Sequence, residues 1–161
     1  CRQALAEHEQ GAHYKLEVSV RKKAPAICVA AKASDPDDIL LSMPLDQWIE
    51  DTSSFTKTVR RATTICVVGR YIIFSITATE PARGYAYIKV VDRNENMANV
   101  VSFTEKSERR ISEQFPASGC LFYNSGILMA RARTCRASFE RQRQGRGGLL
   151  AVQNGPTWTF S

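Results

Sequence analysis

The chain has 161 residues, which is enough for one domain with a hydrophobic core of its own. Hydrophobic residues make up 43% and charged residues 24%, a balance typical of a folded globular protein that excludes disorder over most of the length. The net charge is +6, and the longest apolar runs fall far short of the roughly 20 residues that span a bilayer, which excludes a transmembrane helix.

The first half of the sequence predicts strands. Residues 14–20 alternate apolar and polar side chains, as a strand with one buried face does. An apolar run follows at 26–31, and Asp and Pro residues then mark a loop over 35–44. Residues 63–68 and 71–79 are rich in β-branched and aromatic side chains, which favours two strands joined at Gly69.

The second half predicts further strands separated by turns. Residues 85–91 and 97–104 flank a polar segment and are predicted as a hairpin, whereas 105–119 is charged and broken by proline and glycine. The remaining predicted strands are 121–130, 133–139, 149–152 and 157–160. About eight to ten short strands without a helical period are typical of an all-β fold, and we expect a jelly-roll β-sandwich of two antiparallel sheets.

Motifs of enzyme active sites are missing from the sequence. It contains no G-x-S-x-G, no P-loop, no G-x-G-x-x-G and no H-E-x-x-H, and its two histidines and five cysteines lack zinc-site spacing. We therefore expect a protein that is not an enzyme and that holds no metal or other cofactor. Cys28 and Cys66 lie in apolar runs, which favours buried free thiols, whereas Cys120 or Cys135 could be bridged.

Charge is distributed unevenly along the chain. Residues 131–146 contain six arginines and the single acid Glu140, whereas 35–51 is acidic. This asymmetry indicates a polar partner or a neighbouring subunit. Arginine also pairs with phosphate, so RNA binding by the 131–146 segment is a second hypothesis.

The order of several landmarks resembles the tumour necrosis factor homology domain. Residues 11–17 are similar to its opening strand with an Ala-His pair, and Trp48 falls where such domains carry an early tryptophan. Residues 65–75 resemble an apolar strand followed by Gly-x-Tyr and an aromatic-Ser strand. Residues 119–129 resemble a stretch with Cys and Gly before an apolar strand, and 157–160 the closing strand. The resemblance covers about residues 11–161.

This resemblance implies an extracellular cytokine ligand, secreted or shed from a type II membrane protein, with residues 1–10 as a stalk remnant and 11–161 as the single domain. It implies a homotrimer that binds and clusters cysteine-rich receptor ectodomains, without nucleic-acid or membrane contact. The implied receptor-binding residues are Asp35, Asp37, Asp38, Asp92, Arg93, Asn94, Glu95, Arg141, Arg143 and Arg146. The implied trimer-interface residues are Tyr71, Phe74, Phe122 and Phe160, and the candidate disulfide pair is Cys120 and Cys135.

Two alternatives remain open from the sequence. One is a viral jelly-roll protein of the capsid or movement type, since residues 84–93 are similar to plant-virus movement proteins and the arginines would contact RNA. The other is a complement-type, C1q-like globular head, which shares the fold and the trimer. A stable trimer in solution would favour the ligand or the globular head over the viral protein.

Overall fold

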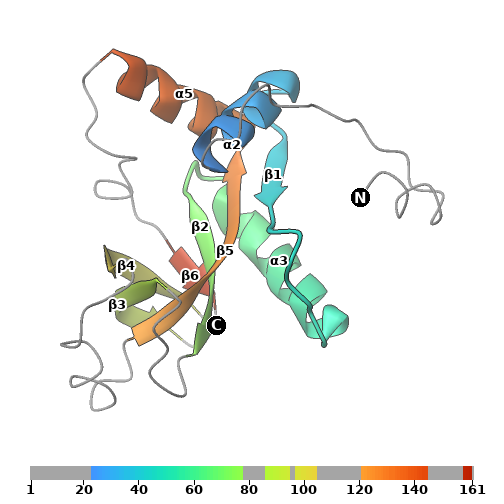
Figure 1. Ribbon diagram of the computed structural model, residues 1–161, viewed down its shortest axis with the longest axis vertical. Coiled ribbons are helices and arrows are strands. Elements are labelled where there is room, and N and C mark those ends of the chain that lie inside the picture. The colour runs from blue at the N-terminus through green and yellow to red at the C-terminus, as the bar shows by residue number, and fades with distance from the viewer. Residues whose placement is uncertain (1–22, 78–85, 95–96, 105–120, 145–157, 161) are drawn as a thin grey trace.

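The chain folds into helices packed on a mixed β-sheet (Figure 1). The computed structural model describes residues 23–77, 86–94, 97–104, 121–144 and 158–160. Within these ranges the helices are α2 (Lys23–Ala33), α3 (Thr52–Cys66) and α5 (Ala132–Arg143). The strands there are β1 (Ile39–Ser42), β2 (Ile72–Thr77), β3 (Tyr87–Asn94), β4 (Met97–Thr104), β5 (Leu121–Arg131) and β6 (Trp158–Phe160).

The sheet closes on itself because β5, next to one edge, also pairs with β3 at the other edge. The strand order is β1-β5-β2-β6-β4-β3, and β5 also pairs with β3. The last residues of β5 pair with β1 and its first residues with β3, while β2 also pairs with β5. Among the described pairings, β2 with β6 is parallel and the others are antiparallel. Apolar side chains from four strands meet in one core cluster: Ile73, Ile88, Val90, Ala98 and Phe122.

Helix α3 covers the sheet with an apolar stripe. Phe55, Val59, Ala62 and Cys66 recur at the three- and four-residue spacing of one helix face, and they pack on a core cluster that contains Phe74 of β2. The helix begins after Asp51, whose carboxylate Oδ1 accepts a hydrogen bond from the Ser54 backbone N–H at 2.8 Å. Burial of the stripe against β2 and β5 fixes this helix on the sheet.

Helices α2 and α5 lie together at one end of the molecule, beyond the end of β5 (Figure 1). Ala31 of α2 packs with Ala132 and Cys135 of α5 in a third core cluster. Arg136 of α5 donates hydrogen bonds to the carbonyls at the end of α2, including Ala31 O at 2.7 Å. Because the last carbonyls of a helix lack partners within it, Arg136 satisfies the end of one helix from the side of the other.

The expectation of an all-β jelly roll is wrong, because three predicted strands or apolar runs are helical. Residues 26–31 lie in α2, 63–66 in the last turns of α3, and 133–139 in α5. In the last case the alternation of residues 133–139 also fits a helix, since Ala132, Cys135 and Phe139 share one face and pack in the same cluster. The fold is α/β in composition, with helices on a mixed sheet.

Several predicted strands are confirmed. Strands β2 and β5 occupy most of 71–79 and 121–130, and β6 occupies 158–160 of the predicted closing strand. The predicted hairpin is present as β3 and β4, which pair antiparallel. The predicted strands at 14–20 and 149–152, the segment 105–119 and the predicted stalk 1–10 lie outside the described residues.

Candidate functional site

A cavity of about 290 Å³ opens between α2, α5 and the middle of β5. Its walls come from segments far apart in the sequence. The lining residues are Lys23, Ala24, Ile27, Ser42, Tyr71, Ile73, Asn124, Gly126, Ile127, Leu128, Cys135 and Phe139. Most of them are apolar, and a few polar groups stand among them, which is the usual make-up of a small-molecule site.

A bulge in β5 brings the polar groups to this cavity. The β2–β5 register shifts between the pairs Ile73↔Leu128 and Ser75↔Asn124, so that residues 125–127 of β5 oppose Phe74 alone. The buried Ser125 hydroxyl holds the bulge in place by donating to the Phe74 carbonyl at 2.6 Å. Asn124 Oδ1 accepts the Gly126 N–H at 2.8 Å, which leaves the Asn124 amide nitrogen as a donor for a ligand.

Gly126 at the bulge allows a lysine to approach the strand closely. Its φ of +75° lies in the left-handed region that glycine adopts without a steric penalty. A Cβ atom at this position would lie 2.7 Å from Lys23 Nζ and 3.4 Å from Pro44 Cγ. The absence of a side chain therefore lets the ammonium group sit directly against the bulge.

The electrostatics of the cavity favour an anion. Burial raises the pKa of Tyr71 to about 12, and its hydroxyl donates to the Thr134 carbonyl at 3.2 Å. Burial also raises the pKa of the Cys135 thiol. Both groups are neutral near pH 7, so Lys23 is the charged group among the described lining residues. Amide, hydroxyl and ammonium groups together suit a ligand that carries both hydroxyls and a negative charge.

Metal-ligating side chains do not gather within the described ranges. In that part of the chain, no group of three or more His, Cys, Asp or Glu side chains could hold a metal ion. The expectation of no metal stays a prediction for the whole chain.

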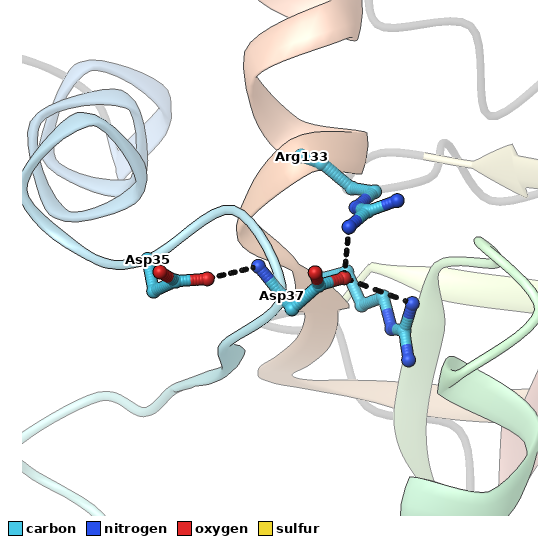
Figure 2. A network of polar contacts seen from close by, with 4 residues as sticks. Asp35, Asp37 and Arg133 are labelled. Carbon is cyan, nitrogen blue, oxygen red and sulfur yellow. Dashed lines mark hydrogen bonds and ion pairs between the residues drawn. The ribbon is translucent and has the colours of Figure 1, made fainter.

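Three of the acidic residues expected to bind a receptor, Asp35, Asp37 and Asp38, belong to a structural network, part of which Figure 2 shows. Asp35 and Asp37 lie in the exposed loop between α2 and β1, and Asp35 Oδ1 accepts the Asp37 N–H at 2.9 Å. Asp37 forms ion pairs with Arg131, at 3.2 Å, and with Arg133. Asp38 Oδ2 accepts the Asp35 N–H at 2.8 Å. The network joins this loop to the junction of β5 and α5.

None of the described contacts joins the other residues expected to bind a receptor to this loop. Arg141 and Arg143 are exposed in the last turn of α5, where Arg143 pairs with Glu140 at 3.4 Å. The backbone of residues 92–94 belongs to β3, while the side chains of Asp92, Arg93 and Asn94, and all of Glu95 and Arg146, lie outside the described structure.

The aromatic residues expected at a trimer interface lie inside the chain where the structure describes them. Phe74 and Phe122 are buried in two core clusters, and Tyr71 packs against a third. The Phe160 side chain and Cys120 lie outside the described structure. Among the described cysteines, Cys135 carries a free thiol, and so does Cys66, as predicted; the pairing of Cys120 with Cys135 stays a prediction.

Sequence reasoning missed the cavity residues as a group. Lys23, Ser42 and Asn124 are separated by up to about a hundred residues, so no local motif joins them. One local signal was present: Asn124-Ser125-Gly126 interrupts an apolar strand with three turn-forming residues, which is typical of a bulge that aims a side chain.

Comparison with known families identifies the chain. A family model described as nucleotidyl transferase matches residues 2–149. The chain belongs to the nucleotidyl transferase family. Alginate biosynthesis protein AlgA of Pseudomonas aeruginosa is 35% identical over 123 residues, which cover 73% of this chain and 26% of AlgA. Mannose-1-phosphate guanylyltransferase RfbM of Salmonella typhimurium is 35% identical over 126 residues, with the same coverage of 73% and 26%. The chain thus spans 26% of the length of these relatives.

A solved structure supports the fold. The mannose-1-phosphate geranyltransferase of Thermus thermophilus superposes with a TM-score of 0.76 at 16% sequence identity, covering 99% of this chain and 55% of that chain. At this identity the likeness concerns the fold alone, and it agrees with helices on a mixed sheet rather than a jelly roll.

The family overturns the functional expectations. The resemblance to the tumour necrosis factor domain and the cytokine hypothesis are wrong, because the chain belongs to the nucleotidyl transferase family. The expectation that it is not an enzyme is wrong for the same reason, since its relatives carry enzyme names. Both alternatives fail too, because the viral protein and the globular head require a jelly roll.

The expected receptor partner and extracellular location are also wrong, because both depend on the cytokine hypothesis. A homotrimer that binds a receptor ectodomain and a shed extracellular ligand have no support in a family of nucleotidyl transferases. The individual residues expected at the receptor and trimer surfaces remain untested predictions. None of the helices in the described ranges is long and apolar enough to cross a membrane.

Proposed function

We propose that this chain provides the sugar-phosphate site of a nucleotidyl transferase that transfers a guanylyl group to mannose 1-phosphate. The observation that carries the proposal is the cavity beside Gly126, where the Lys23 ammonium stands against a bulge that presents the Asn124 amide. The family and the name of the relative RfbM, a mannose-1-phosphate guanylyltransferase, suggest the reaction and the sugar.

The chemistry of the cavity fits a hexose phosphate. Lys23 would neutralise part of the phosphate charge, and the Asn124 amide and the Ser42 hydroxyl would bond to sugar hydroxyls. The apolar wall that contains Ile27 and Leu128 would face the C–H groups of the ring. A volume of about 290 Å³ lies at the small end of ligand sites, as a ligand of this size requires.

The proposed reaction needs positioning more than covalent chemistry from the protein. An oxygen of the mannose phosphate bonds to the α-phosphorus of GTP, the bond from that phosphorus to the bridging oxygen breaks, and pyrophosphate leaves. Holding the phosphate in one orientation therefore supplies much of the rate, as in other phosphoryl transfers. In this chain Lys23 and the bulge of β5 are the groups that would hold it.

Calorimetric titration of the full chain tests the site directly. Mannose 1-phosphate is expected to bind more tightly than mannose or inorganic phosphate, because the cavity offers partners for both halves of the ligand. Lys23→Gln is expected to weaken mannose 1-phosphate binding about tenfold, the usual effect of losing one charge-assisted hydrogen bond.

The matched control is Lys32→Gln. Lys32 is exposed on the same helix but does not line the cavity, so the variant loses the same charge elsewhere and should bind as the wild type does. Equal weakening in both variants, or binding of inorganic phosphate as tight as that of mannose 1-phosphate, contradicts the proposed site. Release of pyrophosphate from GTP with mannose 1-phosphate, but not with mannose, tests the transfer itself.

A further inference from the structure

The loop of residues 43–48, between β1 and α3, lies over the bulge of β5 and has few other anchors among the described residues. Leu45 and Trp48 are 87% and 91% exposed, so little apolar burial holds the loop. Pro44 approaches the bulge, with its Cγ at 3.4 Å from the position that a Gly126 Cβ would take. The loop is therefore placed beside the cavity by a small number of contacts.

One polar contact ties this loop to the strand. The Gln47 side-chain Nε2 donates a hydrogen bond to the Ser125 carbonyl, across 78 positions of sequence. The Ser125 hydroxyl is itself fixed, because it donates to Phe74 O and accepts the Ile127 N–H at 3.2 Å. Gln47 thus bonds to a rigid point of the bulge, between the two residues that face the cavity, Asn124 and Gly126.

We propose that Gln47 is a positioning residue, which latches the 43–48 loop onto the bulge and thereby sets the affinity of the cavity for a sugar phosphate. The proposal rests on the proposed function for the identity of the ligand. Without the latch, the loop loses its polar tie to β5 and Pro44 no longer bounds the space beside Gly126. The Asn124 amide and the Lys23 ammonium then lose the fixed arrangement in which they meet the ligand.

A substitution whose charge depends on pH tests the hydrogen bond between Gln47 and the Ser125 carbonyl. In Gln47→Glu the carboxylate cannot donate to the Ser125 carbonyl, but the protonated carboxyl can. We expect mannose 1-phosphate to bind about tenfold more weakly than to the wild type at pH 8, with the ratio of the two dissociation constants returning toward one as the pH falls to about 4, where an ordinary glutamate carboxyl is largely protonated. Wild type measured in parallel removes the titration of the ligand's own phosphate from this ratio.

A neutral variant separates the lost hydrogen bond from the added charge. Gln47→Ala removes the donor without a charge, and we expect about fivefold weaker binding at every pH, with no recovery at about pH 4. Gln142→Glu, on the exposed part of α5 away from the cavity, is the charge control and should bind as the wild type does. Wild-type affinity in Gln47→Ala overturns the positioning role.

Hydrogen exchange of the ligand-free protein tests the latch independently of the ligand. In Gln47→Ala the amides of Gly126 and Ile127 in the bulge, whose N–H groups bond to the side chains of Asn124 and Ser125, should exchange faster, while those of α3 keep their protection. Unchanged exchange of the bulge overturns the latch. Failure of wild type to bind mannose 1-phosphate, together with faster bulge exchange in the variant, contradicts the proposed function and supports the latch.

Discussion

Gly69 and Gly126 both have a positive φ, but only Gly126 lines the cavity. Alanine variants at the two positions therefore distinguish an effect on ligand binding from an effect of backbone strain. Gly69 has a φ of +81° and Gly126 a φ of +75°. Alanine at either position is expected to destabilise the fold by about 1 kcal/mol or more, because a side chain is strained in this region. Only at Gly126 would the new Cβ lie 2.7 Å from Lys23 Nζ, whereas at Gly69 the nearest atom is Thr134 Oγ1 at 3.8 Å.

Gly126→Ala should therefore lose mannose 1-phosphate affinity and Gly69→Ala should keep it, at a similar cost in stability. The lysine chain can move aside, so the fold survives, but the ammonium leaves its place at the bulge. Calorimetric titration gives the affinity and urea unfolding gives the stability. Equal affinity in the two variants would show that the contact of Lys23 with the bulge is irrelevant to binding.

The buried phenol of Tyr71 makes the stability of the fold depend on pH in the alkaline range. Burial raises its pKa from 10.0 to about 12, so on raising the pH the unfolded chain loses this proton first. The stability that the neutral phenol contributes is complete below pH 10 and is lost between about pH 10 and 12.

Tyr71→Phe removes both the titration and the hydrogen bond to the Thr134 carbonyl. At pH 8 the variant should be less stable by about 1 kcal/mol, the usual value of such a bond. Above pH 10 the difference from the wild type should shrink, because only the wild type has an unfolded phenol that ionises. Urea unfolding at pH 8, 9.5 and 11 checks this, and a constant difference would mean that the phenol is not shielded from water.

At the scale of elements, the N-terminus of α3 depends on one carboxylate. Hydrogen bonds from Ser54 lower the pKa of Asp51, so its capping contribution is present above the unfolded value of 3.8 and is lost as the pH falls through the lower folded value. Asp51→Ala should lower the melting temperature at pH 7, because the Ser54 N–H loses its partner.

Asp51→Asn distinguishes capping from charge. Asparagine is also a good N-cap, so this variant should retain most of the wild-type melting temperature at pH 7 while losing the acid-dependent part. Circular dichroism during heating at pH 7 and pH 3 measures both effects. An asparagine variant as unstable as the alanine variant would argue against the side-chain cap.

The same helix shows where sequence patterns mislead. Residues 63–68 are rich in β-branched side chains and predict a strand, yet 63–66 are the end of a helix. The stripe Phe55, Val59, Ala62 and Cys66 and the cap at Asp51 outweigh local propensity, because burial of a whole helix face contributes more than the preference of a few residues. The helical period appears only in a window that begins at residue 51.

Strands were predictable where alternation and turn signals coincide. The two strands of the β3–β4 hairpin flank a polar tip, and β2 and β5 coincide with long apolar runs. Local rules therefore suffice to predict these four strands. Over 133–139 a short alternating run fits both periods, and packing against α2 decides for the helix. The cavity could not be predicted, because Lys23, Ser42 and Asn124 meet only through the order of the strands and the placement of α2.

At the scale of the whole molecule, the closed sheet and the α2–α5 pair meet at β5. This strand pairs with β1, β2 and β3, and α5 continues directly from its end. The Asp37 ion pairs with Arg131 and Arg133 and the Arg136 bonds to the end of α2 secure that junction. The cavity therefore forms only when the sheet, including the end of β1, and both helices are assembled together.

A ligand of this cavity should accordingly stabilise the entire fold rather than one segment. At a free concentration a hundredfold above its dissociation constant, mannose 1-phosphate should add about 2.7 kcal/mol, which for a chain of this size is a rise in melting temperature of roughly 5–10 °C. The helical signal of circular dichroism should show this rise. The amides of the β3–β4 hairpin should gain the corresponding protection from exchange, although that hairpin does not line the cavity. Lys23→Gln at the same ligand concentration should show a smaller rise. Protection confined to α2 and α5, with the hairpin unaffected, would mean that the two ends of the molecule unfold separately and that β5 does not couple them.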